Sequence, residues 1–174
     1  MGVMKSKILG VIWRNITLGA SDGLVTTYAI IAGSAGANME SRVIVVLGLA
    51  KLIADALSMA AGVYLGVKSE IECGESLDKN SLVGSPIKQG AITFFAFLIT
   101  GSVPLSPYLL NLDNNFTISA ILLGITLFAV GSIKAISAKR AFYKGGLEML
   151  AVGGIVSVLA YLIGFVVESL YSVS

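Results

Sequence analysis

The chain has 174 residues, of which 56% are apolar and 13% are charged, and its net charge is +2. A typical soluble domain has about 25% charged residues, and a small fold cannot bury so large an apolar fraction because its surface-to-volume ratio is high. The composition therefore excludes an ordinary soluble domain, a disordered chain and a disulfide scaffold, and it predicts an all-α polytopic membrane protein.

Five apolar runs are each long enough to cross the hydrocarbon core, which takes about 20 residues of helix. The segment before them, residues 1–14, places apolar residues on one helical face beside basic residues and Trp13. This pattern predicts an interfacial amphipathic helix, with a frayed tail as the alternative. We treat residues 1–174 as a single transmembrane domain, with spans at about residues 15–37, 43–67, 90–112, 116–137 and 145–167.

Basic residues are distributed unevenly around these spans. Ten of the twelve Lys and Arg residues precede the first span, separate the second from the third, or lie about the fourth-to-fifth connection. Arg42 is alone on the opposite side, and Lys51 lies within the second span. The positive-inside rule predicts a cytoplasmic N-terminus and an external C-terminus. We expect a cell membrane if the source is prokaryotic and a vacuolar-type membrane if it is eukaryotic.

The second span carries two charges at depth, and each costs roughly 2.5–3.5 kcal/mol to insert. Lys51, Asp55 and Met59 follow one another at i, i+4 and i+8, so they share one face of the helix, with Ser58 beside them. Carboxylates with a thioether suit a late first-row divalent ion such as Fe²⁺. A buried structural ion pair of Lys51 with Asp55, and Met59 as core filler, are the alternatives.

The first span carries Asp22 between Gly19 and Gly23. Small residues around a membrane carboxylate favour a locally loosened helix that lines a cavity and offers ligands to an ion. The alternative is that the two glycines form a close-packing seam and that Asp22 lies near the cytoplasmic interface.

The connection at residues 68–89 is a short acidic loop on the predicted cytoplasmic side. Glu70, Glu72 and Glu75 are candidates for recruiting cations to the mouth of a path, and a solvated, charge-balanced loop is the alternative.

Two stretches resemble the vacuolar iron transporter family. Residues 22–37 (DGLVTTYAIIAGSAGA) resemble its first-helix signature, and residues 48–70 (GLAKLIADALSMAAGVYLGVKSE) resemble its second. The resemblance implies a homodimer that moves Fe²⁺ or Mn²⁺ out of the cytosol in exchange for protons, along a path at the dimer interface. It implies that Asp22 and Met59 line this path, and Asp55 lies in the same second-helix signature as Met59.

The sequence departs from the family pattern in two places. Lys51 stands where some members have a glutamate in the path, so we expect it and Ser58 to modulate the site. The 68–89 connection is also too short for the helical, Glu- and Met-rich cytoplasmic domain of well-studied members.

These observations predict a proton-coupled exporter of Fe²⁺ or Mn²⁺ whose metal site is formed by Asp22, Asp55 and Met59. We expect no resident cofactor, no nucleic-acid partner and no enzymatic activity, since the chain has no His and no activated nucleophile in the membrane. The alternatives are a transporter of another cation, or a structural membrane protein in which Lys51 and Asp55 lock helix pairing. Near the ends of the last two spans, Lys134 and Glu148 are also positioned to pair.

Overall fold

The computed structural model describes residues 2–73 and 84–172, with side chains from residue 10 onward. The described residues form five α-helices long and apolar enough to cross a membrane, and they contain no strand. The helices are α1 (Gly2–Gly36), α2 (Ser41–Glu72), α3 (Pro86–Leu109), α4 (Asn115–Ser137) and α5 (Phe142–Tyr171).

The five helices correspond one for one to the predicted spans. α1 begins well before residue 15, so residues 2–14 continue the first helix without a break. The amphipathic pattern predicted there rests partly on side chains at residues 1–9, which lie outside the described residues. α2 also runs past the predicted end at Val67 to Glu72, so the first acidic residues of the connection are helical.

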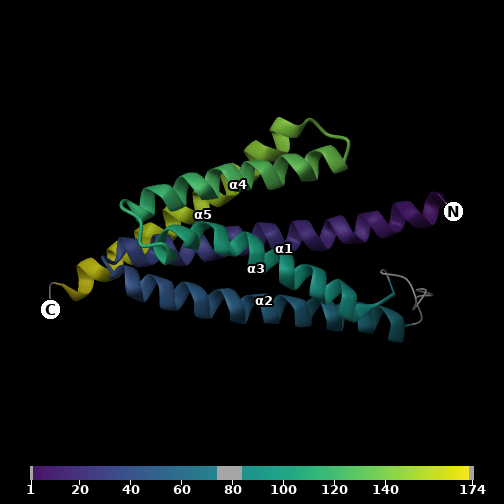
Figure 1. Ribbon diagram of the computed structural model, residues 1–174, viewed down its shortest axis with the longest axis horizontal. Coiled ribbons are helices and arrows are strands. Elements are labelled where there is room, and N and C mark those ends of the chain that lie inside the picture. Colours follow the sequence, from purple (N-terminus) through teal and green to yellow (C-terminus); the bar gives the residue numbers. More distant parts are fainter. Residues whose placement is uncertain (1, 74–83, 173–174) are drawn as a thin grey trace.

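The N-terminus and the C-terminus lie at opposite ends of the elongated molecule (Figure 1). The end of α2, the start of α3 and the α4–α5 turn lie at the N-terminal end of the bundle, while the α1–α2 and α3–α4 turns lie at the other end. Asparagines with positive φ, Asn38 and Asn111, end the helices at this far end. Asn tolerates the left-handed conformation better than most residues.

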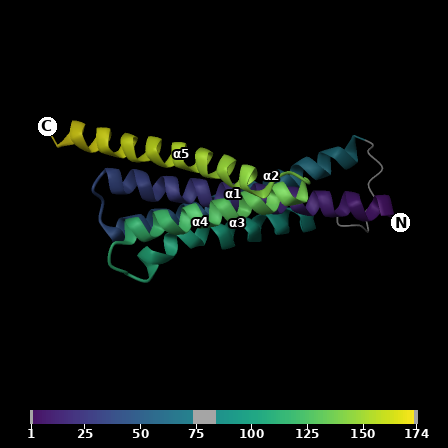
Figure 2. The same cartoon turned by 90° about the horizontal axis from the view of Figure 1, so that it is seen from above.

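α1 and α3 form the centre of the bundle, with α2 on one side and α4 and α5 on the other (Figure 1). Figure 2 shows α5 running along one edge to the C-terminus. The main apolar core lies where α1, α3 and α4 meet, and its fully buried side chains include Leu24, Ile31, Leu105 and Leu127.

The α1–α3 contact depends on two glycines of α1. A Cβ on Gly19 would stand 2.6 Å from the carbonyl oxygen of Thr93, and one on Gly23 would stand 2.6 Å from that of Phe97. Backbones therefore approach each other directly, as small residues allow in lipid. α1 is helical throughout residues 19–23, so the prediction of a loosened helix around Asp22 is wrong and the close-packing seam is confirmed. The glycines supply close approach to α3 rather than backbone freedom.

The two prolines of α3 lie inside the helix, which continues to Leu109. Pro107 has no N–H to donate to the carbonyl of Val103, and the Ser106 hydroxyl donates to that carbonyl instead, at 2.7 Å. A second hydroxyl, that of Ser119 on α4, donates to the carbonyl of Pro104 at 2.5 Å and joins the two helices. The Ser106 hydroxyl thus satisfies the backbone carbonyl that Pro107 leaves without its usual donor, while the Ser119 hydroxyl joins α4 to α3.

Candidate functional site

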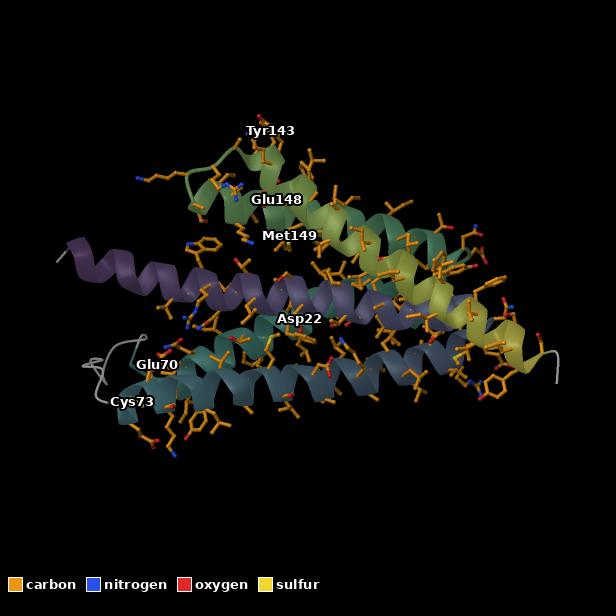
Figure 3. The ribbon with its side chains drawn as sticks, turned by 180° about the vertical axis from the view of Figure 1, so that it is seen from behind. Asp22, Glu70, Cys73, Tyr143, Glu148 and Met149 are labelled. Carbon is orange, nitrogen blue, oxygen red and sulfur yellow. The ribbon has the colours of Figure 1, made fainter. Side chains whose placement is uncertain are left out.

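Three charged side chains lie well within the membrane-spanning helices, one on α1 and two on α2. Figure 3 shows Asp22 on the side of α1 that faces α2. Lys51 and Asp55 of α2 are both near enough to act on the Asp22 carboxylate electrostatically. We refer to Asp22, Lys51 and Asp55 as the intramembrane group; that Asp22 and Asp55 bind a metal ion stays a prediction.

Lys51 makes the most contacts in this group. Its Nζ lies 3.0 Å from Oδ2 of Asp55, it donates a hydrogen bond to Oγ1 of Thr26 on α1, and it lies 5.1 Å from the centroid of the Phe97 ring on α3. The ammonium thus has a carboxylate, a hydroxyl and an aromatic face around it, contributed by three helices. Only 16% of the Lys51 side chain is exposed, and these contacts compensate for its burial.

Thr26 connects Lys51 to the first helix. Its Oγ1 accepts from Lys51 and donates to the backbone carbonyl of Asp22 at 2.6 Å, one helical turn earlier. The hydroxyl therefore has both a donor and an acceptor as partners. This arrangement holds the Lys51 ammonium against the same turn of α1 that carries the Asp22 carboxylate.

Asp55 is the more accessible member of the pair, since 44% of its side chain is exposed. One turn further along α2, Met59 is half-buried and packs against a small cluster formed by Leu52, Ala56 and Phe97. Ser58 is exposed. We call the exposed face of α2 that carries Asp55 the open side of α2. An ion approaching from this side would meet the Asp55 carboxylate before it met the Lys51 ammonium.

The open side of α2 continues towards the N-terminal end of the bundle as a surface of small residues. A Cβ on Gly62 or Gly66 would find no atom within 4 Å. By contrast, four glycines of α1 are used for packing inside the chain: Gly19 and Gly23 contact α3, while Gly33 and Gly36 contact α5. Among the described residues, Gly62 and Gly66 thus form a small-residue pair that packs against no other helix.

The acidic segment after the second span is only partly described. Glu70 and Glu72 are exposed on the last turns of α2, and Glu72 lies 3.8 Å from Lys68. Glu75 lies outside the described residues. Within residues 2–73 and 84–172, no three acidic or cysteine side chains gather closely enough to hold a metal ion. The side chains at or beside the intramembrane group that could bind a metal ion are the carboxylates of Asp22 and Asp55 and the thioether of Met59.

Two residues that contact Lys51, Thr26 and Phe97, were not predicted from the sequence. Thr26 follows Asp22 by one turn, so its place on the same helical face was available from spacing alone. Phe97 has no such signal, because its position over Lys51 depends on how α3 packs. Elsewhere, Glu148 pairs with Arg140 at 3.0 Å, so the predicted pairing with Lys134 is wrong; the α4–α5 turn places Arg140 opposite Glu148.

Comparison with known proteins identifies the group to which this arrangement belongs. The model of the VIT family matches residues 13–80 and 71–165. Vacuolar iron transporter homolog 1 of Arabidopsis thaliana is 32% identical over 152 residues, covering 81% of this chain and 75% of that protein. Vacuolar iron transporter homolog 3 of the same plant is 30% identical over 159 residues, covering 85% of this chain and 79% of that protein.

A shorter and more similar match is found with vacuolar iron transporter 1 of Arabidopsis thaliana, which is 46% identical over 61 residues. That match covers 35% of this chain and 24% of the plant protein. The matches to the homologs, in contrast, extend over most of both chains. The family match extends into all five helices and includes Asp22, Lys51 and Asp55. The chain is a multi-pass membrane protein that belongs to the VIT family.

Proposed function

We propose that this protein transports divalent metal ions, Fe²⁺ or Mn²⁺, out of the cytosol. The observation that carries the proposal is the pair of carboxylates, Asp22 on α1 and Asp55 on α2, placed within electrostatic reach of each other inside membrane-spanning helices. Ionisable residues at such depth mark ion pathways. Family membership supports the same assignment, since relatives matching along most of the chain are named vacuolar iron transporter homologs.

The donor set favours a transition metal. Carboxylate oxygens from Asp22 and Asp55 suit hard divalent ions, and the thioether of Met59 adds a softer ligand one turn from Asp55. Fe²⁺ accepts both kinds of donor, and Mn²⁺ accepts the oxygens well. Mg²⁺ and Ca²⁺ gain little from the thioether, so the mixed set disfavours them as cargo.

A second copy of the chain would complete the site. Asp55 is 44% exposed on the open side of α2, and Gly62 and Gly66 on the same helix have no neighbour within 4 Å. Small residues let helices approach closely in lipid, and a two-fold axis along this surface would bring two sets of ligands together. The transport path then runs along the interface of a homodimer.

Proton exchange follows from the same carboxylates. A membrane carboxylate binds either a metal ion or a proton, so protons arriving from outside release the metal there. The direction follows from the basic residues, most of which lie at the N-terminal end of the bundle, because the positive-inside rule predicts that this end is cytoplasmic. The exposed Glu70 and Glu72 lie at this end and would concentrate cations at the entrance.

A structural role is the second candidate, and the 3.0 Å contact between Lys51 and Asp55 favours it. In that case the two residues only neutralise each other and fix helix packing. The two candidates differ in what they predict for flux. If the protein is a transporter, a paired Lys51→Met, Asp55→Leu variant folds but loses the flux that wild-type protein shows. If the role is structural, the same variant folds and neither protein shows flux.

The test is Fe²⁺ and Mn²⁺ flux into or out of proteoliposomes with an imposed pH gradient. Wild-type protein is compared with Asp22→Ala, with Asp55→Ala and with Glu148→Ala, which removes an exposed carboxylate far from the group. We expect gradient-driven flux in wild type and in the Glu148 variant and none in the other two. Full flux in both Asp variants would refute the site, and absence of flux from folded wild-type protein would favour the structural role.

A further inference from the structure

The intramembrane group already contains a cation, the Lys51 ammonium, and this cation belongs to the chain. It lies 3.0 Å from Asp55, the more exposed of the two carboxylates. A divalent ion that binds Asp55 therefore encounters a positive charge within contact distance. Two ions of like charge so close together repel strongly in a region of low dielectric constant.

The other two contacts of Lys51 do not depend on Asp55. The Thr26 hydroxyl and the Phe97 ring are uncharged, and they come from α1 and α3 rather than from α2. Phe97 is completely buried among Leu52 and Ala56, which fixes its ring in place. These two groups can keep the ammonium in the bundle when the Asp55 carboxylate turns to another cation.

We infer that Lys51 is a tethered competitor for the transported metal. It occupies the Asp55 carboxylate while no metal is bound, and an incoming divalent ion must displace it from Asp55. The inference rests on the proposed function, because the competition requires Asp55 to be a metal ligand.

The charges of the group indicate what such a competitor does. Asp22 and Asp55 together carry two negative charges, and Lys51 neutralises one of them. A divalent ion therefore binds a group of net charge −1, which weakens its binding and favours its release. Lys51 thus sets the affinity of the site low enough for turnover.

The experiment measures Mn²⁺ affinity of the purified full-length chain in nanodiscs, by loss of the free Mn²⁺ electron paramagnetic resonance signal. Lys51→Met removes the charge and keeps most of the length of the side chain, while Lys51→Arg keeps the charge. The matched control is Lys68→Met, because Lys68 also pairs with an acidic residue one turn away on α2, Glu72, outside the group. Lys51→Gln is a second neutral variant in case the methionine variant fails to fold.

We expect both neutral variants at position 51 to bind Mn²⁺ about tenfold more tightly than wild type, since a like charge next to the ion has been removed. Lys51→Arg and Lys68→Met should bind as wild type does. The gain should disappear in an Asp55→Ala background, because Lys51 competes for that carboxylate. A purely structural Lys51 would change thermal unfolding without this dependence on Asp55.

The outcomes separate this inference from the proposed function. Wild-type affinity or weaker binding in both neutral variants, with wild-type protein binding and transporting Mn²⁺, overturns the competitor role and leaves the function standing. No Mn²⁺ binding by wild type or by any variant overturns both. Binding by the neutral variants alone supports Lys51 as the occupant of Asp55 and overturns metal transport by the natural chain.

Discussion

The Asn15 side chain donates from Nδ2 to Oε1 of Gln89 at 3.0 Å, which joins α1 to α3 at a place where both residues are at least 98% buried. Replacing Asn15 by Leu removes this contact from the helix interface. We expect the free energy of unfolding to fall by about 1 kcal/mol, the usual size of an interhelical hydrogen bond in a membrane protein. Thermal unfolding in detergent measures the change.

The companion variant is the pair Asn15→Leu, Gln89→Leu. Each single substitution already breaks the one hydrogen bond that the two side chains share, so the double variant should be destabilised by less than the sum of the single variants. Strict additivity would show that the contact does not stabilise the packing of α1 against α3.

Close backbone approach at Gly23 gives a second prediction. Gly23→Ala would place a methyl group 2.6 Å from the Phe97 carbonyl oxygen, so α1 and α3 must separate. We expect lower thermal stability and reduced flux, because Phe97 and Asp22 would both shift. Gly154→Ala on α5 is the matched change, since a Cβ there meets no atom within 4 Å, and it should leave stability the same or raise it. Equal effects of the two substitutions would contradict the packing of α1 on α3.

A third prediction concerns the end of α3 that contains Pro104 and Pro107. Ser106→Ala removes the hydroxyl that donates to the Val103 carbonyl at 2.7 Å, and we expect a cost of about 1 kcal/mol in unfolding free energy. Pro107→Ala restores a backbone N–H able to donate to the same carbonyl. In that background Ser106→Ala should cost almost nothing. A Ser106→Ala cost that is unchanged by Pro107→Ala would show that the hydroxyl does not replace the missing backbone donor.

Met59→Leu separates ligand chemistry from packing. The two side chains have similar volume, and such exchanges usually cost less than about 1.5 kcal/mol, so the cluster around Phe97 should hold. The thioether is lost, however, and we expect Fe²⁺ flux in proteoliposomes to fall by more than Mn²⁺ flux because sulfur prefers the softer ion. Equal loss for the two metals would assign Met59 to packing alone.

Much of the fold follows from hydropathy and spacing. The five apolar runs correspond to the five helices, and the i, i+4 spacing of Lys51 and Asp55 correctly predicts their contact. Both inferences are local, because run length and helical periodicity depend only on the neighbouring sequence. The ends of α1 and α2 were predicted less well, since polar residues can extend a helix beyond the hydrocarbon core.

The errors concern contacts between helices. Glycines on either side of Asp22 are compatible with a loosened helix and with close packing, and only the position of α3 decides between them. The partner of Glu148 likewise depends on the α4–α5 turn, which brings Arg140 into reach. The aromatic ring beside Lys51 could not be found at all, because residues 51 and 97 are brought together by tertiary packing.

α5 exposes most of its surface, and just four of its residues are buried: Gly145, Gly146, Gly153 and Gly164. In a mutational scan along this helix, most exchanges among apolar residues should therefore change stability little, whereas substitutions at these four glycines should strongly destabilise the protein. Sequence constraint on α5 therefore falls chiefly on these four glycines, where the absence of a side chain is required. Its exposed positions can change among apolar residue types with little effect on the fold.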